Sequence, residues 1–186
     1  YPIEALKLKD DEIDKEIDFI KKNKKNIIAI GEVGIDLKED LEFERQNEIF
    51  RKFIELAKEI DKPITVHSRE AEKQCIEILE EMQAKKVIMH CFSGKMKLAQ
   101  KIADNNWYLS VPASVKYNEH FQKIVSLIPV ENLLCETDSP YLHPDREQKN
   151  YPSNVIESYK KIAEIKKLSL KETERIIENN FKALHS

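Results

Sequence analysis

The segment IIAIGEVGIDL (27–37) decides the fold, together with ITVHSREA (64–71), VIMHCFSG (87–94) and LLCETDSPYLHP (133–144). Each segment begins with apolar, partly β-branched residues, a pattern typical of a buried parallel strand. Each then reaches one side chain that can bind a metal ion: Glu32, His67, His90 and Asp138 in turn. Because ligands bind at the carboxyl ends of parallel strands, we predict that these four side chains share one site.

Strands and helices alternate along the chain. Apolar runs predict strands at 27–31, 64–67, 87–91, 107–111 and 133–136, and amphipathic stretches predict helices at 10–24, 41–60, 71–83, 95–105, 117–128, 152–167 and 170–184. Strict alternation implies a parallel sheet with right-handed crossovers. We therefore predict an α/β fold of the (β/α)8 TIM-barrel type, as a single domain over residues 1–186. About five parallel strands with flanking helices make it an N-terminally incomplete barrel.

Length and composition limit the class of protein. The 186 residues carry 41% hydrophobic and 35% charged residues and a net charge of −3, which suits one globular core. No apolar run approaches the roughly 20 residues that cross a membrane, and no signal peptide opens the chain, so we expect a cytoplasmic location and no membrane partner. The charge gives no global attraction to nucleic acid. The three cysteines, Cys75, Cys91 and Cys135, are expected to be reduced thiols rather than a disulfide or a nucleophile.

Glu32 is flanked by Gly31 and Gly34 in a chain with only three glycines. Two glycines around one acid indicate unusual backbone angles or a close approach of another segment. A carboxylate there can bridge two divalent cations; the alternative is an acid that caps a loop. Asp36 is a weaker candidate: it would not bind the metal itself but would hydrogen-bond to a residue that does.

His67 and His90 occupy the same register at the ends of successive predicted strands. A lone strand histidine is usually a hydrogen-bonded core residue, but two at one register favour metal ligands. Imidazole suits zinc and other transition ions.

Two candidates for anion binding follow these histidines. Arg69 can form a forked pair with phosphate oxygens or an ion pair with Glu70 or Glu72. Ser93 precedes a predicted helix, where free N–H groups bind anions but where serine is also an ordinary N-cap.

Asp138 lies in the sequence Glu-Thr-Asp-Ser-Pro (136–140). It can ligate a metal and orient or deprotonate a water, or it can form an Asx turn before the proline. His143, in the following loop, is a candidate for substrate contact.

Together, GEVGID, VHSREA, HCFSG and ETDSPYL resemble the successive signatures of the TatD family of metal-dependent deoxyribonucleases, within the amidohydrolase-like metallo-hydrolases. Each signature alone is weak, but four in the family order over residues 31–142 are specific. The resemblance implies a barrel with one or two divalent metal ions (Mg, Mn or Zn) at its C-terminal face and phosphodiester hydrolysis of DNA, often described as 3′–5′ exonuclease action.

The resemblance also implies roles for individual residues. Glu32 corresponds to the metal-bridging carboxylate, and His67 and His90 to ligands of the second metal. Asp138 corresponds to a ligand of the first metal that positions the attacking water, so Glu32 and Asp138 are the expected catalytic pair. Arg69, His143 and Ser93 are the expected substrate contacts.

One family feature is missing from this chain. The family's first strand carries a His-x-His pair that completes the first metal site, and the chain contains no such pair. Its start resembles the family segment after the third strand, so we expect the first βα units to be lacking here. Two alternatives stay open: a related metallo-hydrolase of a small ester, amide or phosphate, and a non-catalytic metal-binding protein. The oligomeric state is open as well.

Overall fold

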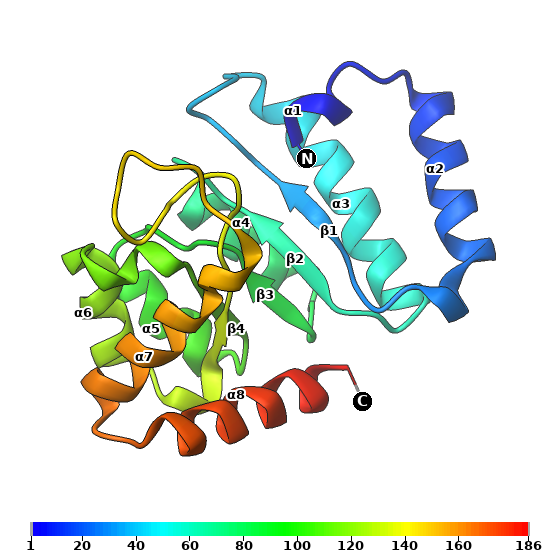
Figure 1. The fold of residues 1–186 in the computed structure, drawn as a ribbon. Helices are drawn as coiled ribbons and strands as arrows, with labels where there is room; N and C mark the ends of the chain where they lie inside the picture. Colours follow the sequence, from blue (N-terminus) through cyan, green and yellow to red (C-terminus); the bar gives the residue numbers. More distant parts are fainter. Residues whose placement is uncertain (1, 186) are drawn as a thin grey trace. The chain divides into compact units, whose positions relative to one another are not determined.

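The computed structural model describes residues 2–185, with two compact units in which helices and strands alternate. The first unit contains residues 2–90 and His185, and the second contains residues 91–184 (Figure 1).

Three strands of the first unit, β1 (Ile30–Gly34), β2 (Ile64–His67) and β3 (Val87–Met89), pair in chain order and in parallel. Its helices are α1 (Pro2–Ala5), α2 (Asp10–Lys22), α3 (Phe43–Glu59) and α4 (Glu72–Glu81), with a short 3-10 turn, η1, at Lys24–Asn26. Each of the two connections between these strands contains a helix, as parallel pairing requires.

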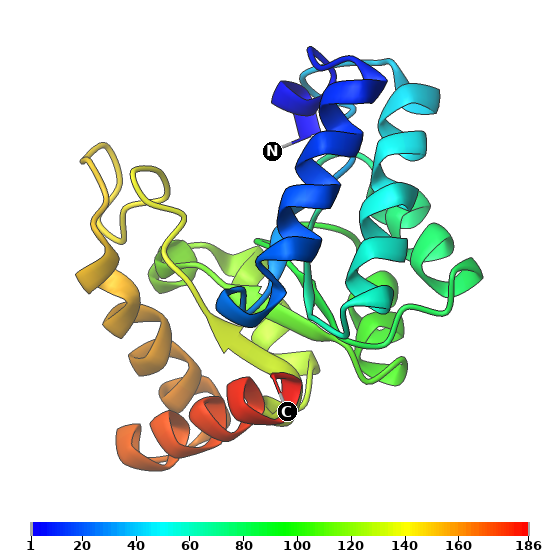
Figure 2. The same ribbon diagram turned by 90° about the vertical axis from the view of Figure 1, so that its right-hand side faces the viewer.

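Helix α3 packs against β1 through an apolar stripe. Phe50, Phe53, Ile54 and Ala57 recur at helical spacing and are all buried, the pattern of an amphipathic helix that faces a core. Helix α2 lies alongside the outer face of α3, as Figures 1 and 2 both show, and contributes the buried Ile13. The strands of this unit are thus held in place by a buried helix face.

The second unit contains strands β4 (Tyr108–Val111) and β5 (Leu133–Cys135), which also pair in parallel. Its helices are α5 (Met96–Asp104), α6 (Glu119–Leu127), α7 (Val155–Lys166) and α8 (Leu170–Leu184), and its 3-10 turns are η2 (Ala113–Lys116), η3 (Val130–Asn132) and η4 (Pro152–Asn154). No helix among residues 2–185 is both long and apolar enough to span a membrane.

Helix α8 begins where its sequence predicts and is tied to β5. The Ser169 hydroxyl accepts from the backbone N–H of Glu172, whose carboxylate accepts from the Ser169 backbone; this is a capping box. Further along the helix, the Asn180 amide donates to the carbonyls of Val130 and Leu133 at 2.8 Å each. A buried side chain thus satisfies backbone groups at the start of β5.

Two predicted strand boundaries are wrong. The first strand was expected at 27–31 but spans Ile30–Gly34, so Glu32 lies inside it rather than after it. The third ends at Met89, so Cys91 follows the strand. The glycines caused the first error, because Gly31 and Gly34 normally break strands but here permit close pairing.

Strand β1 approaches β2 so closely that no side chain fits at Gly34. Its φ is +144°, and a Cβ there would overlap the carbonyl oxygen of His67. Gly31 has a φ of +145°, and a Cβ there would lie 2.7 Å from the Thr65 carbonyl oxygen. The pairing also shifts by one residue between Ile30 and Val33. The predicted close approach of another segment at these glycines is confirmed.

We expect Gly34→Ala to lower the free energy of unfolding by roughly 2–6 kcal/mol, the sum of backbone strain and overpacking. Chemical denaturation followed by circular dichroism measures this change. Ile28→Ala, at a position 67% exposed just before the same strand, is the control and should change stability little. A Gly34→Ala protein as stable as the wild type would contradict the close packing of β1 on β2.

Candidate metal centre at the ends of strands β1 to β3

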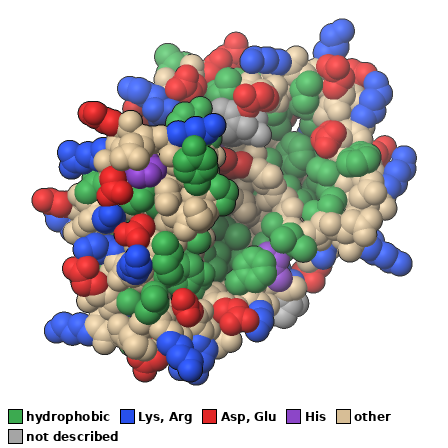
Figure 3. Space-filling view, in the orientation of Figure 1, with side chains coloured by type: hydrophobic (Ala, Val, Ile, Leu, Met, Phe, Trp, Pro, Cys, Tyr) green, Lys and Arg blue, Asp and Glu red, His purple; other side chains and the backbone are tan. Residues whose placement is uncertain are grey.

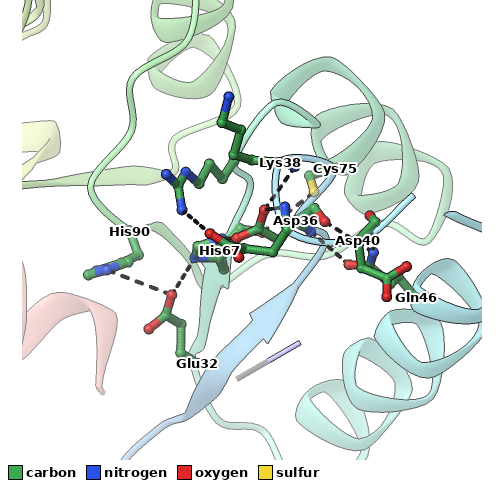
Figure 4. A network of polar contacts seen from close by, with 10 residues as sticks. Glu32, Asp36, Lys38, Asp40, Gln46, His67, Cys75 and His90 are labelled. Atoms are coloured by element: carbon green, nitrogen blue, oxygen red, sulfur yellow. Dashed lines mark hydrogen bonds and ion pairs between the residues drawn. The ribbon is translucent and has the colours of Figure 1, made fainter. Parts of the chain in front are cut away.

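His67, the last residue of β2, lies between two carboxylates of the preceding βα segment (Figure 4). Its Nδ1 is 2.6 Å from Oε1 of Glu32, and its Nε2 is 2.7 Å from Oδ2 of Asp36. The His67 side chain is 13% exposed and that of Asp36 is fully buried. Both ring nitrogens are therefore used, each by a different acid.

A third ligand-type side chain reaches Glu32 from β3. His90 directly follows Met89, and its backbone N–H donates to the Val66 carbonyl at 2.9 Å. Its Nε2 is 3.7 Å from Oε1 of Glu32, the same oxygen that contacts His67. The structure thus brings together three of the four predicted ligands, Glu32, His67 and His90.

Electrostatics keep Glu32 ionised. Burial by itself would raise the pKa of this carboxyl, but the hydrogen bond from His67 and the positive charge that His90 and His67 can carry more than offset it. The net effect lowers the pKa of Glu32 below its usual range. The site therefore offers an anionic oxygen beside two imidazoles at neutral pH.

This donor set suits a divalent cation chemically. Two imidazole nitrogens and one carboxylate oxygen are zinc ligands, and a second carboxylate behind a ligating histidine is a recurrent partner of such sites. Within residues 2–185, however, no three His, Cys, Asp or Glu side chains are arranged around a common point that would hold an ion. Nδ1 of His67 and Oε1 of Glu32, 2.6 Å apart, are instead hydrogen-bonded to each other. Their role as metal ligands stays a prediction.

The loop after β1 is clasped to the loop after β2. Leu37 N donates to the Arg69 carbonyl at 3.0 Å, Arg69 pairs with Glu39 at 3.1 Å, and Lys38 pairs with Glu70 at 3.5 Å. The expected alternative partners of Arg69, Glu70 or Glu72, are wrong, because Glu39 from the other loop reaches the guanidinium first. These side chains are about half exposed.

The other predicted site residues lie in the second unit. Asp138 is in the loop after β5, in a left-handed conformation (φ 55°), which aspartate tolerates better than most residues. His143 lies further along this loop, and its Nδ1 accepts from Asp145 N at 3.0 Å. Ser93 is exposed and is not the N-cap of α5, because that helix begins at Met96 and its N-cap is Lys95.

Positive charges gather nowhere on the face drawn in Figure 3, where basic and acidic side chains are interspersed. Lys116 of η2 pairs with Asp145 at 2.6 Å and with Glu157 at 3.6 Å. The hydrogen bond to Asp145 raises the pKa of this lysine. Its charge, like that of Arg69, is already balanced by carboxylates.

Comparison with known proteins places the whole chain in one family. The family model described as TatD related DNase matches residues 1–186. The chain belongs to the TatD-related DNase family. The sequence signatures that suggested this family are thus confirmed as a guide to it.

Relatives and solved structures of the TatD family agree with this assignment. An uncharacterized metal-dependent hydrolase of Methanocaldococcus jannaschii is 38% identical over 97% of this chain and 71% of its own length. The human deoxyribonuclease TATDN3 is 31% identical over 97% of this chain and 70% of its own length. The crystal structure of a TatD homolog from Escherichia coli, 24% identical, superposes with a TM-score of 0.92 over 100% of this chain and 74% of that one. The predicted α/β fold of TIM-barrel type, with parallel strands and flanking helices, is confirmed.

Sequence reasoning missed one residue of this candidate site. Gln46 of α3 is 2% exposed; its Oε1 accepts from Asp36 N at 2.7 Å, and its Nε2 donates to the carbonyls of Asp36 (3.2 Å) and Asp40 (3.0 Å). The available signal was its position, since Gln46 lies four residues before Phe50 on the buried stripe of α3. A polar residue on an apolar stripe indicates a buried hydrogen-bonding task.

Cys75 lies behind the site and is expected to be inert. Its thiol is fully buried and donates to the His67 carbonyl at 3.6 Å, and burial raises its pKa well above the usual range. We expect its modification by iodoacetamide at pH 8 to be slower by a factor on the order of 100 or more in the native protein than in denaturant, because local opening must come first. Peptide mass spectrometry measures the two rates, and equal rates would contradict the burial.

Proposed function

We propose that this protein is a metal-dependent hydrolase that cleaves phosphodiester bonds of DNA. The observation that carries the proposal is the cluster of Glu32, His67 and His90, in which one anionic oxygen is close to two imidazole nitrogens. Glu32 lies within β1, and the two histidines lie at the carboxyl ends of β2 and β3, where sites of this fold class are built.

The names of related proteins support both halves of the proposal. Relatives from Methanocaldococcus jannaschii and Bacillus subtilis carry the name of metal-dependent hydrolases. The human relative is named a deoxyribonuclease, and the mouse relative a putative one. The chain covers between 61% and 74% of the lengths of these four, so the activity of the whole protein is part of the proposal.

Glu32, His67, His90 and Asp138 would hold one or two divalent cations, of Mg, Mn or Zn. A bound cation supplies Lewis acidity and lowers the pKa of water toward neutrality. Glu32, ionised at neutral pH, contributes the negative charge that retains it. His67, the last residue of β2, and His90, which directly follows β3, contribute neutral nitrogens. Asp138 orients the attacking water and takes up its proton.

The substrate would be contacted by Arg69, His143 and Ser93. Arg69 is suited to a phosphate because its planar fork matches two oxygens. Its present partner, Glu39, is exposed, and an exposed ion pair is worth only about 0–1 kcal/mol. A phosphate could therefore displace that carboxylate at small cost.

A second candidate is hydrolysis of a small phosphate, ester or amide by the same residues. The observation in its favour is that Arg69 and Lys116 are both paired with carboxylates, in a chain whose net charge is −3. Tight binding of long DNA usually requires several unbalanced cations. The third possibility, metal binding without catalysis, is an outcome of the experiment below.

We expect Glu32→Gln and Asp138→Asn each to lower DNA hydrolysis by about 100-fold or more, since loss of an outer-shell partner alone costs 10–100-fold. The assay uses protein stripped of metal and reloaded with Mg²⁺, Mn²⁺ or Zn²⁺, an end-labelled single-stranded oligodeoxynucleotide, its RNA counterpart and bis-p-nitrophenyl phosphate. Glu44→Gln, an exposed acid in the first turn of α3, is the matched control. Its rate should equal that of the wild type.

Each result separates the candidates. Cleavage of the oligodeoxynucleotide that requires Glu32 and Asp138 supports the nuclease. Cleavage of bis-p-nitrophenyl phosphate alone supports the small-substrate hydrolase. Bound metal without turnover of any substrate supports the binding protein. Near-wild-type DNA cleavage by Glu32→Gln, at matched metal content, would refute the assignment of this site.

A further inference from the structure

We propose that Asp36 is a positioning residue that decides which nitrogen of His67 faces the metal. The inference rests on the proposed function, because it takes His67 as a ligand. It concerns a residue that would not touch the ion itself and acts only through the histidine ring.

The geometry divides the two nitrogens of His67 between two tasks. Nδ1 is on the side of Glu32, whose Oε1 also lies 3.7 Å from His90 Nε2. Nε2 is on the opposite side of the ring, 2.7 Å from Asp36 Oδ2. Nδ1 is therefore the nitrogen on the side of Glu32 and His90, as Figure 4 shows. A nitrogen that binds a cation cannot carry a proton, so Nε2 must then be the N–H donor to Asp36.

Asp36 is fixed independently of His67. Its Oδ1 accepts from the backbone N–H groups of Lys38 at 3.0 Å and Glu39 at 2.9 Å. Its own backbone is held on both sides by the amide of Gln46, which accepts from Asp36 N and donates to Asp36 O. Asp36 and Gln46 are 0% and 2% exposed. The carboxylate thus has one oxygen committed to the turn and only the other available to His67.

Because its two oxygens accept hydrogen bonds from different partners, position 36 needs an aspartate. Asparagine has one acceptor and one donor atom, whereas position 36 requires acceptors on both sides. If the asparagine oxygen stays on the turn, its NH₂ group faces Nε2 of His67, which must then accept. The proton moves to Nδ1, and the nitrogen that faces Glu32 can no longer bind a cation. The substitution keeps size and shape and reverses the preferred tautomer.

The test is the affinity for Zn²⁺, measured by isothermal titration calorimetry on the metal-free protein. We expect Asp36→Asn to bind Zn²⁺ 10- to 100-fold more weakly than the wild type, the range typical of outer-shell partners. Asp40→Asn is the matched control, because it makes the same charge change four residues away and its carboxylate accepts only from Glu42 N among the bonds described here. That variant should bind within twofold of the wild type.

A second readout detects the tautomer directly, first in the wild type and then in Asp36→Asn. In Zn²⁺-loaded wild-type protein with ¹⁵N-labelled histidine, NMR should show His67 with a proton on Nε2 and a metal-shifted Nδ1. A merely structural role for Asp36 would lower thermal stability without changing these signals in a folded Asp36→Asn protein, whereas the inference expects the proton on Nδ1.

The outcomes distinguish this inference from the proposed function. Wild-type protein that binds no Zn²⁺ would overturn the inference about Asp36, whereas the proposed function would be overturned only if Mg²⁺ and Mn²⁺ also failed to bind. Wild-type binding with an equal affinity in Asp36→Asn, or a His67 ring protonated on Nδ1 in the loaded wild type, would overturn the role of Asp36 alone. Weakened Zn²⁺ binding with the tautomer reversed would support it, whatever substrate the enzyme cleaves.

Discussion

The close approach of β1 to β2 is the constraint on which the site depends. Two glycines with φ near +145° let the backbone of β1 come against Thr65 and His67 without a side chain between them. The residue beyond, Ile35, then donates its N–H to the carbonyl of His67 at 3.1 Å. Because side chains alternate along an extended segment, Glu32 and Asp36 emerge on the same side and reach the two edges of one imidazole ring.

Much of this arrangement could be predicted because it depends on the local order of apolar and polar residues in the sequence. Alternating apolar runs and amphipathic stretches indicated the βα order, and polar residues after successive strands indicated a shared edge. His67 and His90 were found this way, since each follows a short, mainly apolar run, 64–66 or 87–89, that is typical of a buried strand. The glycines around Glu32 also carried a readable signal, because glycine is rare in this chain.

The remainder required three-dimensional information. No local rule places Gln46 against the backbone of Asp36, because the contact joins residues ten apart across a loop whose course is not encoded by periodicity. The partner of Arg69 was misjudged for the same reason: sequence neighbours were considered, but a residue thirty positions earlier lies closer. The predicted boundaries of β1 were wrong because glycine, which usually ends a strand, here lies within the strand and allows close pairing with β2.

The contacts between the loops after β1 and β2 differ in how strongly they depend on ionic strength. Its outer pairs, Arg69 with Glu39 and Lys38 with Glu70, are about half exposed, so mobile ions at physiological concentration screen them over about 8 Å. The contacts of His67 with its two acids are largely buried and feel such ions far less. Added salt would therefore loosen the rim around the histidine while the inner geometry persists, so that access and chemistry respond to the solvent separately.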